Sequence, residues 1–446
     1  MKICLTASRM LESMLPDVKP DGGKSYRPSM YNFTHLDGEH TYIYNVLTRR
    51  LARLTEEEVT LLQADAVCGD VAAAKALIAK RFLIACDVEE TAHYLQLFST
   101  QELFLSSGDR GYKTYRILTT TGCNARCFYC FEQGACVQNM TEDTADAVIA
   151  YIVKTHDPDA TVELAWFGGE PLLRPAVIDR ICSGLSAAGV AYRSTMTTNG
   201  SLFTPQLMEK AKDLWKLEKV QITLDGVGEE HERRKAYVSL PDAYKLTLER
   251  ISQMIKAGIG VIVRMNMDLQ NAENIHELYD ALRTRYSSTE PIAFDPALLF
   301  EELIGGERTR TAQQQATLRE SWLQLRQRIW EDGFCRVRPL LNGLPRWHCM
   351  ANSPETAIVL PDGKLTVCDP GCESMYYGDV WQGVTHPELV SGWRRCTDLR
   401  EKCRNCPYLP ECTGFALCPY EVSDCRAQAE EDLRRRLAVT VAKYGR

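Results

Sequence analysis

Three closely spaced cysteines are the residues of this chain best suited to chemistry: Cys123, Cys127 and Cys130. A CxxxCxxC loop brings three thiolates near enough to bind three irons of a [4Fe-4S] cluster, and it leaves the fourth iron without a protein ligand. The alternative for a bare three-cysteine loop is a zinc knuckle. In the cluster interpretation, the open iron is where a small molecule can bind and react.

Two features accompany this loop: Tyr129 stands before its last cysteine, and Trp166–Pro171 (WFGGEP) follows about one βα unit downstream. The combination resembles the radical S-adenosylmethionine (SAM) enzymes. The resemblance implies that the open iron binds the amino and carboxylate groups of SAM. One electron from the cluster then breaks the sulfonium bond, and the resulting 5′-deoxyadenosyl radical removes a hydrogen atom from the substrate.

The resemblance also implies which residues contact SAM. Tyr129 would lie near the adenine, Gly168 and Gly169 would let the backbone approach the methionyl end, and Glu170 would accept from the SAM ammonium group. Polar residues at later strand ends complete the cofactor-binding candidates: Thr198, Asn199, Asp225, Arg264 and Asn266. Turn chemistry and ordinary barrel lining are the alternatives for this last group.

The end of the chain is rich in cysteine, with ten of the eighteen cysteines from Cys335 onward. Their spacing resembles the SPASM extension of radical SAM enzymes, whose seven cysteines hold two auxiliary [4Fe-4S] clusters. The matching cysteines are Cys349, Cys368, Cys403, Cys406, Cys412, Cys418 and Cys425. Five residues separate Cys412 from Cys418, where relatives have three. A structural four-cysteine zinc site is the alternative.

The SPASM resemblance divides these ligands between two clusters. The second cluster takes Cys403, Cys406, Cys412 and Cys425, and the first takes Cys349, Cys368 and Cys418. The first cluster then needs a fourth ligand, for which Cys335 is preferred over Cys372 because an extra upstream cysteine has this role in some relatives. If neither binds, the open iron could hold a substrate thiolate.

The residues around these motifs predict alternating strands and helices from Lys113 onward, with the period of a βα unit. The expected strands are Thr114–Thr120, Thr161–Phe167, Tyr192–Thr198, Val220–Leu224, Gly260–Met267 and Pro291–Pro296. The expected helices are Thr141–Lys154, Pro205–Trp215, Asp242–Lys256, Asn274–Arg285 and Thr311–Trp330. Six repeats imply an α/β fold with a partial (β/α)6 barrel, whose site lies at the carboxyl ends of the strands. The charged run His231–Lys235 is interpreted as a solvated helix face.

The first ~110 residues follow another pattern. Ser29–His35 and Thr41–Asn45 flank a hairpin signal, and short helical stretches follow. This resembles the winged-helix element of peptide-modifying radical SAM enzymes, where a sheet edge pairs with a precursor's leader peptide. A structural cap on the barrel is the alternative. We therefore expect a winged-helix-like domain at 1–110, a radical SAM barrel at 111–333 and an iron–sulfur SPASM domain at 334–446.

The amino-acid composition argues against two classes of partner, nucleic acid and membranes. A net charge of −7, from 52 basic and 59 acidic residues, provides no basic surface for nucleic acid and no polybasic tract for membranes. No segment approaches the ~18–20 apolar residues of a spanning helix, and the first residues lack a signal-peptide core. Clustered cysteines in a cytoplasmic protein are more often metal ligands than disulfides. We expect a cytoplasmic metal-binding enzyme.

These features predict a radical SAM/SPASM maturase of a ribosomally made peptide (RiPP). It would abstract a hydrogen atom from the precursor and install a cross-link, most simply a cysteine thioether. The expected cofactors are SAM and three [4Fe-4S] clusters, with flavodoxin or ferredoxin as electron donor. One alternative is a sulfatase-type maturase forming formylglycine, in which Asp369, next to Cys368, would be the catalytic base. The other is a non-catalytic metal-binding adaptor.

Overall fold

The computed structural model describes residues 1–446 apart from 16–17, 107–110, 131, 133, 135, 300–302, 305–306, 309, 336, 341–342, 344–348, 370–372, 395–398, 412–424 and 446. The side chains of 102–106, 303–304, 307–308 and 394 are also outside this description. Three predicted or alternative cluster ligands therefore lie outside the described residues: Cys372, Cys412 and Cys418.

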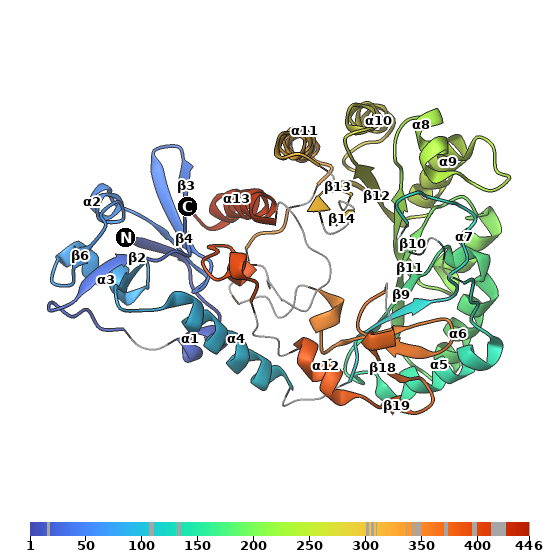
Figure 1. The fold of residues 1–446 in the computed structure, drawn as a ribbon, viewed down its shortest axis with the longest axis horizontal. Helices are drawn as coiled ribbons and strands as arrows, with labels where there is room; N and C mark the ends of the chain where they lie inside the picture. Colours follow the sequence, from blue (N-terminus) through green and yellow to red (C-terminus); the bar gives the residue numbers. More distant parts are fainter. Residues whose placement is uncertain are drawn as a thin grey trace. The chain divides into compact units, whose positions relative to one another are not determined.

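Six parallel strands, neighbours in chain order, form the main sheet (Figure 1). They are β8 (Thr114–Leu118), β9 (Val162–Phe167), β10 (Tyr192–Thr198), β11 (Leu217–Thr223), β12 (Gly260–Met267) and β13 (Ile292–Leu298). Along β9, buried residues alternate with half-exposed ones, so one face of the strand packs into the core. All six strands lie where the sequence predicts them, and the predicted α/β fold with a parallel sheet is confirmed.

Helices connect these strands, and side-chain caps explain where several of them begin. They are α5 (Glu142–Thr155), α6 (Pro175–Ala187), α7 (Pro205–Asp213), α8 (Glu229–Lys235), α9 (Ala243–Lys256), α10 (Ala272–Arg285) and α11 (Ala312–Glu331). Thr141 caps α5 by accepting from the amide of Thr144, and Thr311 forms a capping box with Gln314 at α11. The five predicted helices are confirmed, whereas α6 and α8 were not predicted as helices with these bounds.

A later segment extends the main sheet beyond β8. Strand β16 (Thr356–Val359) pairs in parallel with β8, and β17 (Lys364–Thr366), β18 (Tyr376–Asp379) and β19 (Gly383–Val384) follow as antiparallel neighbours. The turn between β16 and β17 contains Gly363, whose φ of 82° favours glycine. This extension brings the chain around Cys368 next to the first strand of the parallel sheet.

The N-terminal residues form two antiparallel sheets. One has the order β1 (Lys2–Leu5), β5 (Arg50–Arg53), β4 (His40–Asn45), β3 (Asn32–Asp37), and the other has β6 (Val67–Cys68), β2 (Ser25–Pro28), β7 (Leu83–Ala85). Their helices are α1 (Arg9–Met14), α2 (Glu56–Leu61), α3 (Ala72–Ala79) and α4 (Glu90–Ser106). The predicted hairpin is confirmed as β3 and β4, joined through Gly38. The winged-helix assignment stays a prediction.

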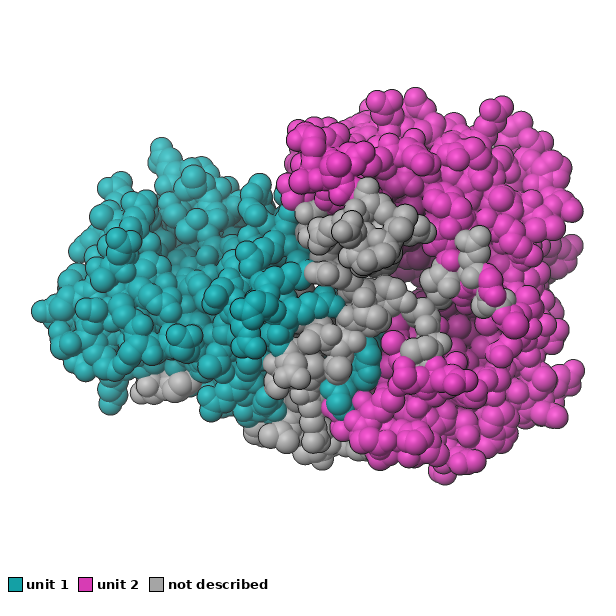
Figure 2. Space-filling view, in the orientation of Figure 1, with its two compact units in different colours: residues 1–109, 337–353, 392–446 teal, residues 110–336, 354–391 magenta. Residues whose placement is uncertain are grey.

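The chain divides into two compact units (Figure 2). Unit 1 contains 1–109, 337–353 and 392–446, with α13 (Cys425–Tyr444) at its C-terminal end. Unit 2 contains 110–336 and 354–391, with the parallel sheet and its extension. The small strands β14 (Leu303–Ile304) and β15 (Glu307–Arg308) belong to unit 2, whereas α12 (Pro387–Arg394) extends from unit 2 into unit 1. In the described residues, no helix is long and apolar enough to cross a membrane.

Candidate active site

The cysteine loop follows β8 directly and is fixed by backbone hydrogen bonds. The amide of Arg126 donates to the carbonyl of Lys235 at 2.8 Å, and the amide of Val238 donates to the carbonyl of Asn124 at 2.8 Å. Both bonds join the loop to the end of α8. The loop is therefore positioned by two strand ends of the sheet, because α8 follows β11.

The three thiols of this loop lie close to one another. Burial, together with the negative charges of Glu170, Cys127 and Cys130, raises the pKa of Cys123 to about 11. Burial also raises the pKa of Cys130. No described group of three or more donors is already arranged around a metal position. Three adjacent, partly buried thiolates nevertheless need a cationic partner, so this donor set fits an iron–sulfur cluster.

Gly168 and Gly169 pack the end of β9 against the start of the cysteine loop. A Cβ at Gly168 would meet the carbonyl oxygen of Thr120 at 2.2 Å, and one at Gly169 would meet that of Gly122 at 2.4 Å. The amide of Gly169 donates to Thr120 at 3.0 Å. These glycines therefore have a structural requirement of their own, and their contact with SAM stays a prediction.

Glu170 is fully buried at the same strand end. Its carboxylate accepts from the Thr198 hydroxyl at 2.8 Å, the Asn199 amide at 2.8 Å and the Leu172 amide at 3.0 Å. Burial raises the pKa of Glu170, and these hydrogen bonds oppose the rise. The structure thus brings three predicted SAM contacts, Glu170, Thr198 and Asn199, into one network. Asn199 also donates to the side chain of Asn124 in the cysteine loop at 2.8 Å.

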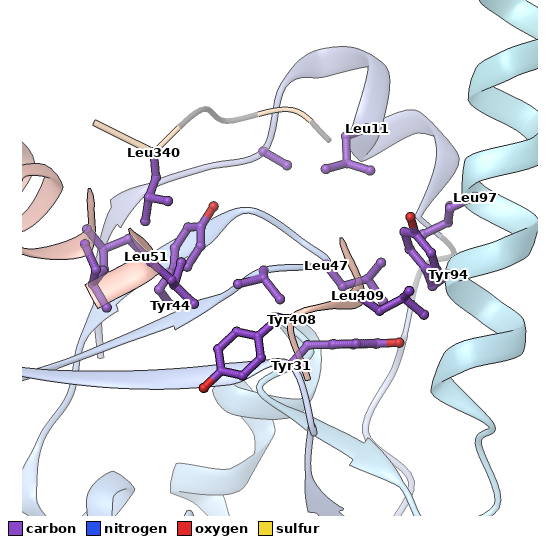
Figure 3. Close-up of a cluster of buried hydrophobic side chains, with 14 of the residues drawn as sticks. Leu11, Tyr31, Tyr44, Leu47, Leu51, Tyr94, Leu97, Leu340, Tyr408 and Leu409 are labelled. Carbon is purple, nitrogen blue, oxygen red and sulfur yellow. The ribbon is translucent and has the colours of Figure 1, made fainter. Parts of the chain in front are cut away.

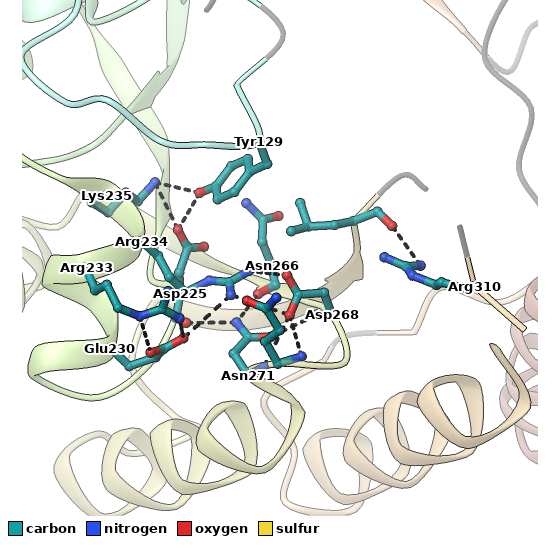
Figure 4. A network of polar contacts seen from close by, with 12 residues as sticks. Tyr129, Asp225, Glu230, Arg233, Arg234, Lys235, Asn266, Asp268, Asn271 and Arg310 are labelled. Carbon is teal, nitrogen blue, oxygen red and sulfur yellow. Dashed lines mark hydrogen bonds and ion pairs between the residues drawn. The ribbon is translucent and has the colours of Figure 1, made fainter. Parts of the chain in front are cut away.

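Tyr129 and Asp225 meet at a buried lysine that the sequence did not single out (Figure 4). The Tyr129 hydroxyl donates to Asp225, and the ammonium of Lys235 lies 3.1 Å from that hydroxyl and 3.7 Å from the Asp225 carboxylate. Burial raises the pKa of Tyr129 well above its usual range. Burial lowers the pKa of Lys235, but Asp225 and Tyr129 outweigh it, so the lysine stays charged.

The prediction that His231–Lys235 is a solvated helix face is wrong. His231, Arg234 and Lys235 are buried within α8. Arg234 pairs with Asp268 at 2.6 Å, and its guanidinium lies 4.8 Å from the ring centre of Phe128 in the cysteine loop. The charged groups of Arg234 and Lys235 are therefore directed inward. The buried carboxylates of Asp225 and Asp268, at the ends of β11 and β12, offset the cost of their desolvation.

Arg264 and Asn266 lie on β12, as predicted. The Arg264 guanidinium donates to the Asn266 side chain at 3.1 Å and lies 3.5 Å from Asp295 on β13. The side-chain amide of Asn271 donates to the carbonyls of both Asp225 and Asn266, each at 2.9 Å. This bridge, which no sequence motif indicated, fixes the ends of β11 and β12 next to each other.

A second polar cluster includes Asp369, the predicted catalytic base. Asp369 forms an ion pair of 2.6 Å with Arg116 on β8, and the Arg116 guanidinium stacks 3.7 Å from the ring centre of Phe167. Burial raises the pKa of Asp369, and Arg116 opposes that rise. Burial, followed by the charge of Asp369, raises the pKa of Glu132 to about 7. Arg116 and Glu132 were not predicted. Glu132 could have been indicated by its place two residues after Cys130, whereas no motif lies beside Arg116.

The auxiliary cysteines divide between the two units. Cys403 and Cys406 are buried in unit 1, and Cys425 begins α13. Burial raises the pKa of Cys403, and Cys406 and Cys425 add to the rise, so these three thiols are near neighbours that fit one cluster. For the first auxiliary cluster, Cys349 belongs to unit 1, whereas Cys335 and Cys368 belong to unit 2. That grouping stays a prediction.

Comparisons with known proteins agree with this arrangement. The model of the "Radical SAM superfamily" matches residues 117–284. An "AdoMet-dependent heme synthase" of Methanosarcina barkeri (strain Fusaro / DSM 804) is 22% identical over 343 residues, covering 70% of this chain and 90% of the relative. A "Probable GTP 3′,8-cyclase" of Methanocaldococcus jannaschii is 30% identical over 280 residues, covering 58% of this chain and 85% of the relative.

Solved structures share the fold at low sequence identity. The structure of anSMEcpe with bound AdoMet has a TM-score of 0.57 and 13% identity, and the match covers 74% of this chain and 99% of that one. Streptococcus suis SuiB has a TM-score of 0.52 and 15% identity, covering 87% and 95%. SuiB bound to the precursor peptide SuiA has a TM-score of 0.50. These likenesses support the α/β architecture with additional N-terminal sheets.

Proposed function

The chain belongs to the radical SAM superfamily, and we propose that it modifies a ribosomally made precursor peptide by abstracting a hydrogen atom and installing a cross-link, most simply a cysteine thioether. Membership of the superfamily makes it an enzyme, so the adaptor alternative is no longer supported. The proposal includes SAM, three [4Fe-4S] clusters, a flavodoxin- or ferredoxin-like electron donor and a cytoplasmic location. When bound, SAM and the catalytic cluster supply the hydrogen-abstracting chemistry.

The N-terminal sheets are the observation that carries the peptide proposal. Strand β7 is an edge strand, and a cavity of about 690 Å³ runs beside it. The cavity is lined by all of β7 and by residues of α4, including Ala92, His93 and Gln96. An extended leader peptide could add a strand to such an edge and place alternate side chains in the cavity. Likeness to SuiB, which was solved with a precursor peptide, supports a peptide as the substrate.

The barrel residues have positioning roles in this proposal. Cys123, Cys127 and Cys130 would hold the catalytic cluster, and Glu170 with its partners Thr198 and Asn199 would orient SAM. The contacts of Lys235 and Tyr129 with the buried Asp225 fix the position of the cysteine loop. Asp369 and Glu132 would face the substrate side as proton acceptors.

The decisive experiment combines the anaerobically reconstituted protein with SAM, a reductant and short cysteine-containing peptides, chosen from any open reading frames found beside its gene. We expect SAM cleavage and a peptide lighter by two hydrogens, because a thioether forms with loss of one hydrogen from carbon and one from sulfur. The protein should hold close to twelve irons, and changing Cys123, Cys127 and Cys130 to alanine should remove about a third of them and all SAM cleavage. Stoichiometric zinc, or an unmodified peptide, would contradict the proposal.

Cavity variants test the leader site separately. Ala92 is exposed on α4 and lines the cavity, so Ala92→Trp should fill it and lower leader affinity at least tenfold. Ala76→Trp on α3 is the matched control, because Ala76 is also exposed but does not line the cavity. Equal leader affinity in both variants would place the peptide elsewhere.

Formylglycine formation is the second candidate, and the Asp369–Arg116 pair favours keeping it. Asp369 has one carboxylate oxygen without a hydrogen-bond partner among the described atoms, as a proton acceptor requires. The two reactions differ in the product: an aldehyde reacts with a hydrazide probe, whereas a thioether does not. Asp369→Asn should abolish aldehyde formation if this candidate is correct.

A further inference from the structure

Arg49 is a fully buried arginine in the turn between β4 and β5. Its guanidinium pairs with the carboxylate of Glu411 and donates to the carbonyl of Pro410 at 2.8 Å. It also donates to the hydroxyl of Tyr44 at 3.3 Å. Arg436 of α13 holds the other carboxylate oxygen of Glu411 at 2.9 Å. A buried charge with this many partners fixes the position of the chain around Glu411.

Glu411 directly precedes Cys412 in the sequence. Other N-terminal residues contact the chain shortly before Glu411. The hydroxyl of Thr91 donates to the carbonyl of Arg404 at 2.5 Å. The ring of Phe33 lies 5.0 Å from that of Tyr408. Arg404 stands between Cys403 and Cys406, so these contacts lie within residues 401–411, which we call the cysteine segment.

Cys403 and Cys406 belong to the hydrophobic core of unit 1, together with N-terminal residues. Each cysteine is only 9% exposed. Figure 3 shows Tyr408 and Leu409 among the N-terminal side chains Tyr31, Tyr94 and Leu47. The described part of the cysteine segment has two short 3₁₀ turns, Glu401–Cys403 and Leu409–Glu411. Its shape must therefore come from packing rather than from regular secondary structure.

We propose that the N-terminal domain forms part of the site of the second auxiliary cluster, with Arg49 as the residue that positions the cysteine segment through Glu411. The inference uses the proposed assignment of the described cysteines Cys403, Cys406 and Cys425 to one cluster, and it goes beyond the proposed peptide reaction. The N-terminal residues would then do more than bind a peptide, because they pack around two of the cluster ligands, Cys403 and Cys406. Without the Arg49 pair, the turn Leu409–Glu411 is no longer fixed. Because the Leu409 amide donates to the carbonyl of Cys406 at 3.1 Å, that ligand is then displaced and the cluster is lost.

The test uses the full-length chain with Cys123, Cys127 and Cys130 changed to alanine, so that only auxiliary clusters contribute iron. Electron paramagnetic resonance of the reduced protein and iron content are measured together. This parent should hold about eight irons and give two auxiliary signals. Arg49→Gln should lose about four irons and one signal, and Arg49→Lys should recover part of both because the charge is kept.

Two controls separate positioning from general destabilisation. Leu51→Ala weakens the same core on β5 without touching Glu411, so it should lower the unfolding temperature and keep both signals. Arg434→Gln removes an exposed ion pair with Glu430 on α13 and should change neither readout. Eight irons and an unchanged spectrum in Arg49→Gln overturn the proposal. The proposal is also overturned if Leu51→Ala loses the same auxiliary signal to the same extent as Arg49→Gln. It is overturned as well if the parent binds zinc at these cysteines.

Discussion

His231 is a buried histidine whose protonation should limit stability at low pH. Burial, followed by the charge of Lys235, lowers its pKa to about 3, and its Nδ1 accepts from the amide of Asp225 at 3.3 Å. Below about pH 6.5 the unfolded chain binds a proton at this residue, whereas the folded chain does not. As the pH is lowered through this range, the free energy of unfolding should therefore fall by roughly 1.4 kcal/mol per pH unit because of this residue alone.

The variant His231→Gln checks this prediction. Between pH 7.5 and 5.5 the parent should lose roughly 1 to 2 kcal/mol more stability than the variant, measured by denaturant unfolding of unit 2. The same change at the exposed His386 is the control and should leave the pH dependence as it is in the parent. A parallel pH dependence in the parent and His231→Gln would contradict the prediction.

Residue types and spacing identified the chemistry, but they could not identify the direction of charged side chains. Glu170, Thr198 and Asn199 were predicted from motif position, and they meet in one network. Lys235 and Arg234 were misjudged because a charged run in a short helix has the same pattern whether it faces solvent or buried acids. Their partners, Asp225 and Asp268, lie on other elements of the chain, so no local pattern reveals the pairing.

At the scale of elements, close backbone packing between β8 and β9 should be the most sensitive feature of the site. Gly169 needs no unusual φ, but a Cβ there would lie 2.4 Å from the carbonyl oxygen of Gly122. Because that neighbour is backbone, it cannot move aside as a flexible side chain would. Gly169→Ala should therefore separate the two strand ends, destabilise unit 2 by about 1–3 kcal/mol and weaken SAM binding.

A helix glycine supplies the control for this prediction. A methyl group at Gly392 in α12 would meet only open space, and the φ of this glycine is ordinary, so Gly392→Ala should leave stability equal or slightly higher. Calorimetry of SAM binding and thermal unfolding measure both variants. Normal SAM affinity in Gly169→Ala would show that the loop can shift without disturbing the site.

The strands and most barrel helices were predictable because their signals are local. The alternation of strand-like and helix-like segments predicted the six parallel strands, and the predicted ranges for α5 and α11 begin at the threonines that cap these helices in the structure. The pairing of β16 with β8 was not predictable, since the whole remainder of the parallel sheet lies between them in the sequence and no local pattern specifies a partner. The same limit applies to α13, whose packing on β3 depends on contacts across the chain.

At the scale of the molecule, the compact units do not follow the order of the sequence. Every cofactor ligand predicted from the motifs lies after Lys113, so the sequence predicts that removing the residues before it leaves reductive SAM cleavage intact. In the structure, however, residues 1–109 share one core with Leu433, Leu437 and the cysteine segment around Cys406. A division by motif therefore separates residues that the hydrophobic core holds together.

Deletion of residues 1–109 should consequently affect the two units differently. The remaining part of unit 1 would expose the apolar faces of α13 and of the cysteine segment, so we expect aggregation and loss of about four irons. Unit 2 keeps its parallel sheet, the cysteine loop and the Glu170 network, so reductive SAM cleavage per catalytic cluster should persist. Iron content, light scattering and 5′-deoxyadenosine formation measure the three outcomes. A soluble truncated chain with twelve irons would show that the N-terminal sheets are independent of the auxiliary site, whereas loss of SAM cleavage would show that unit 2 depends on them.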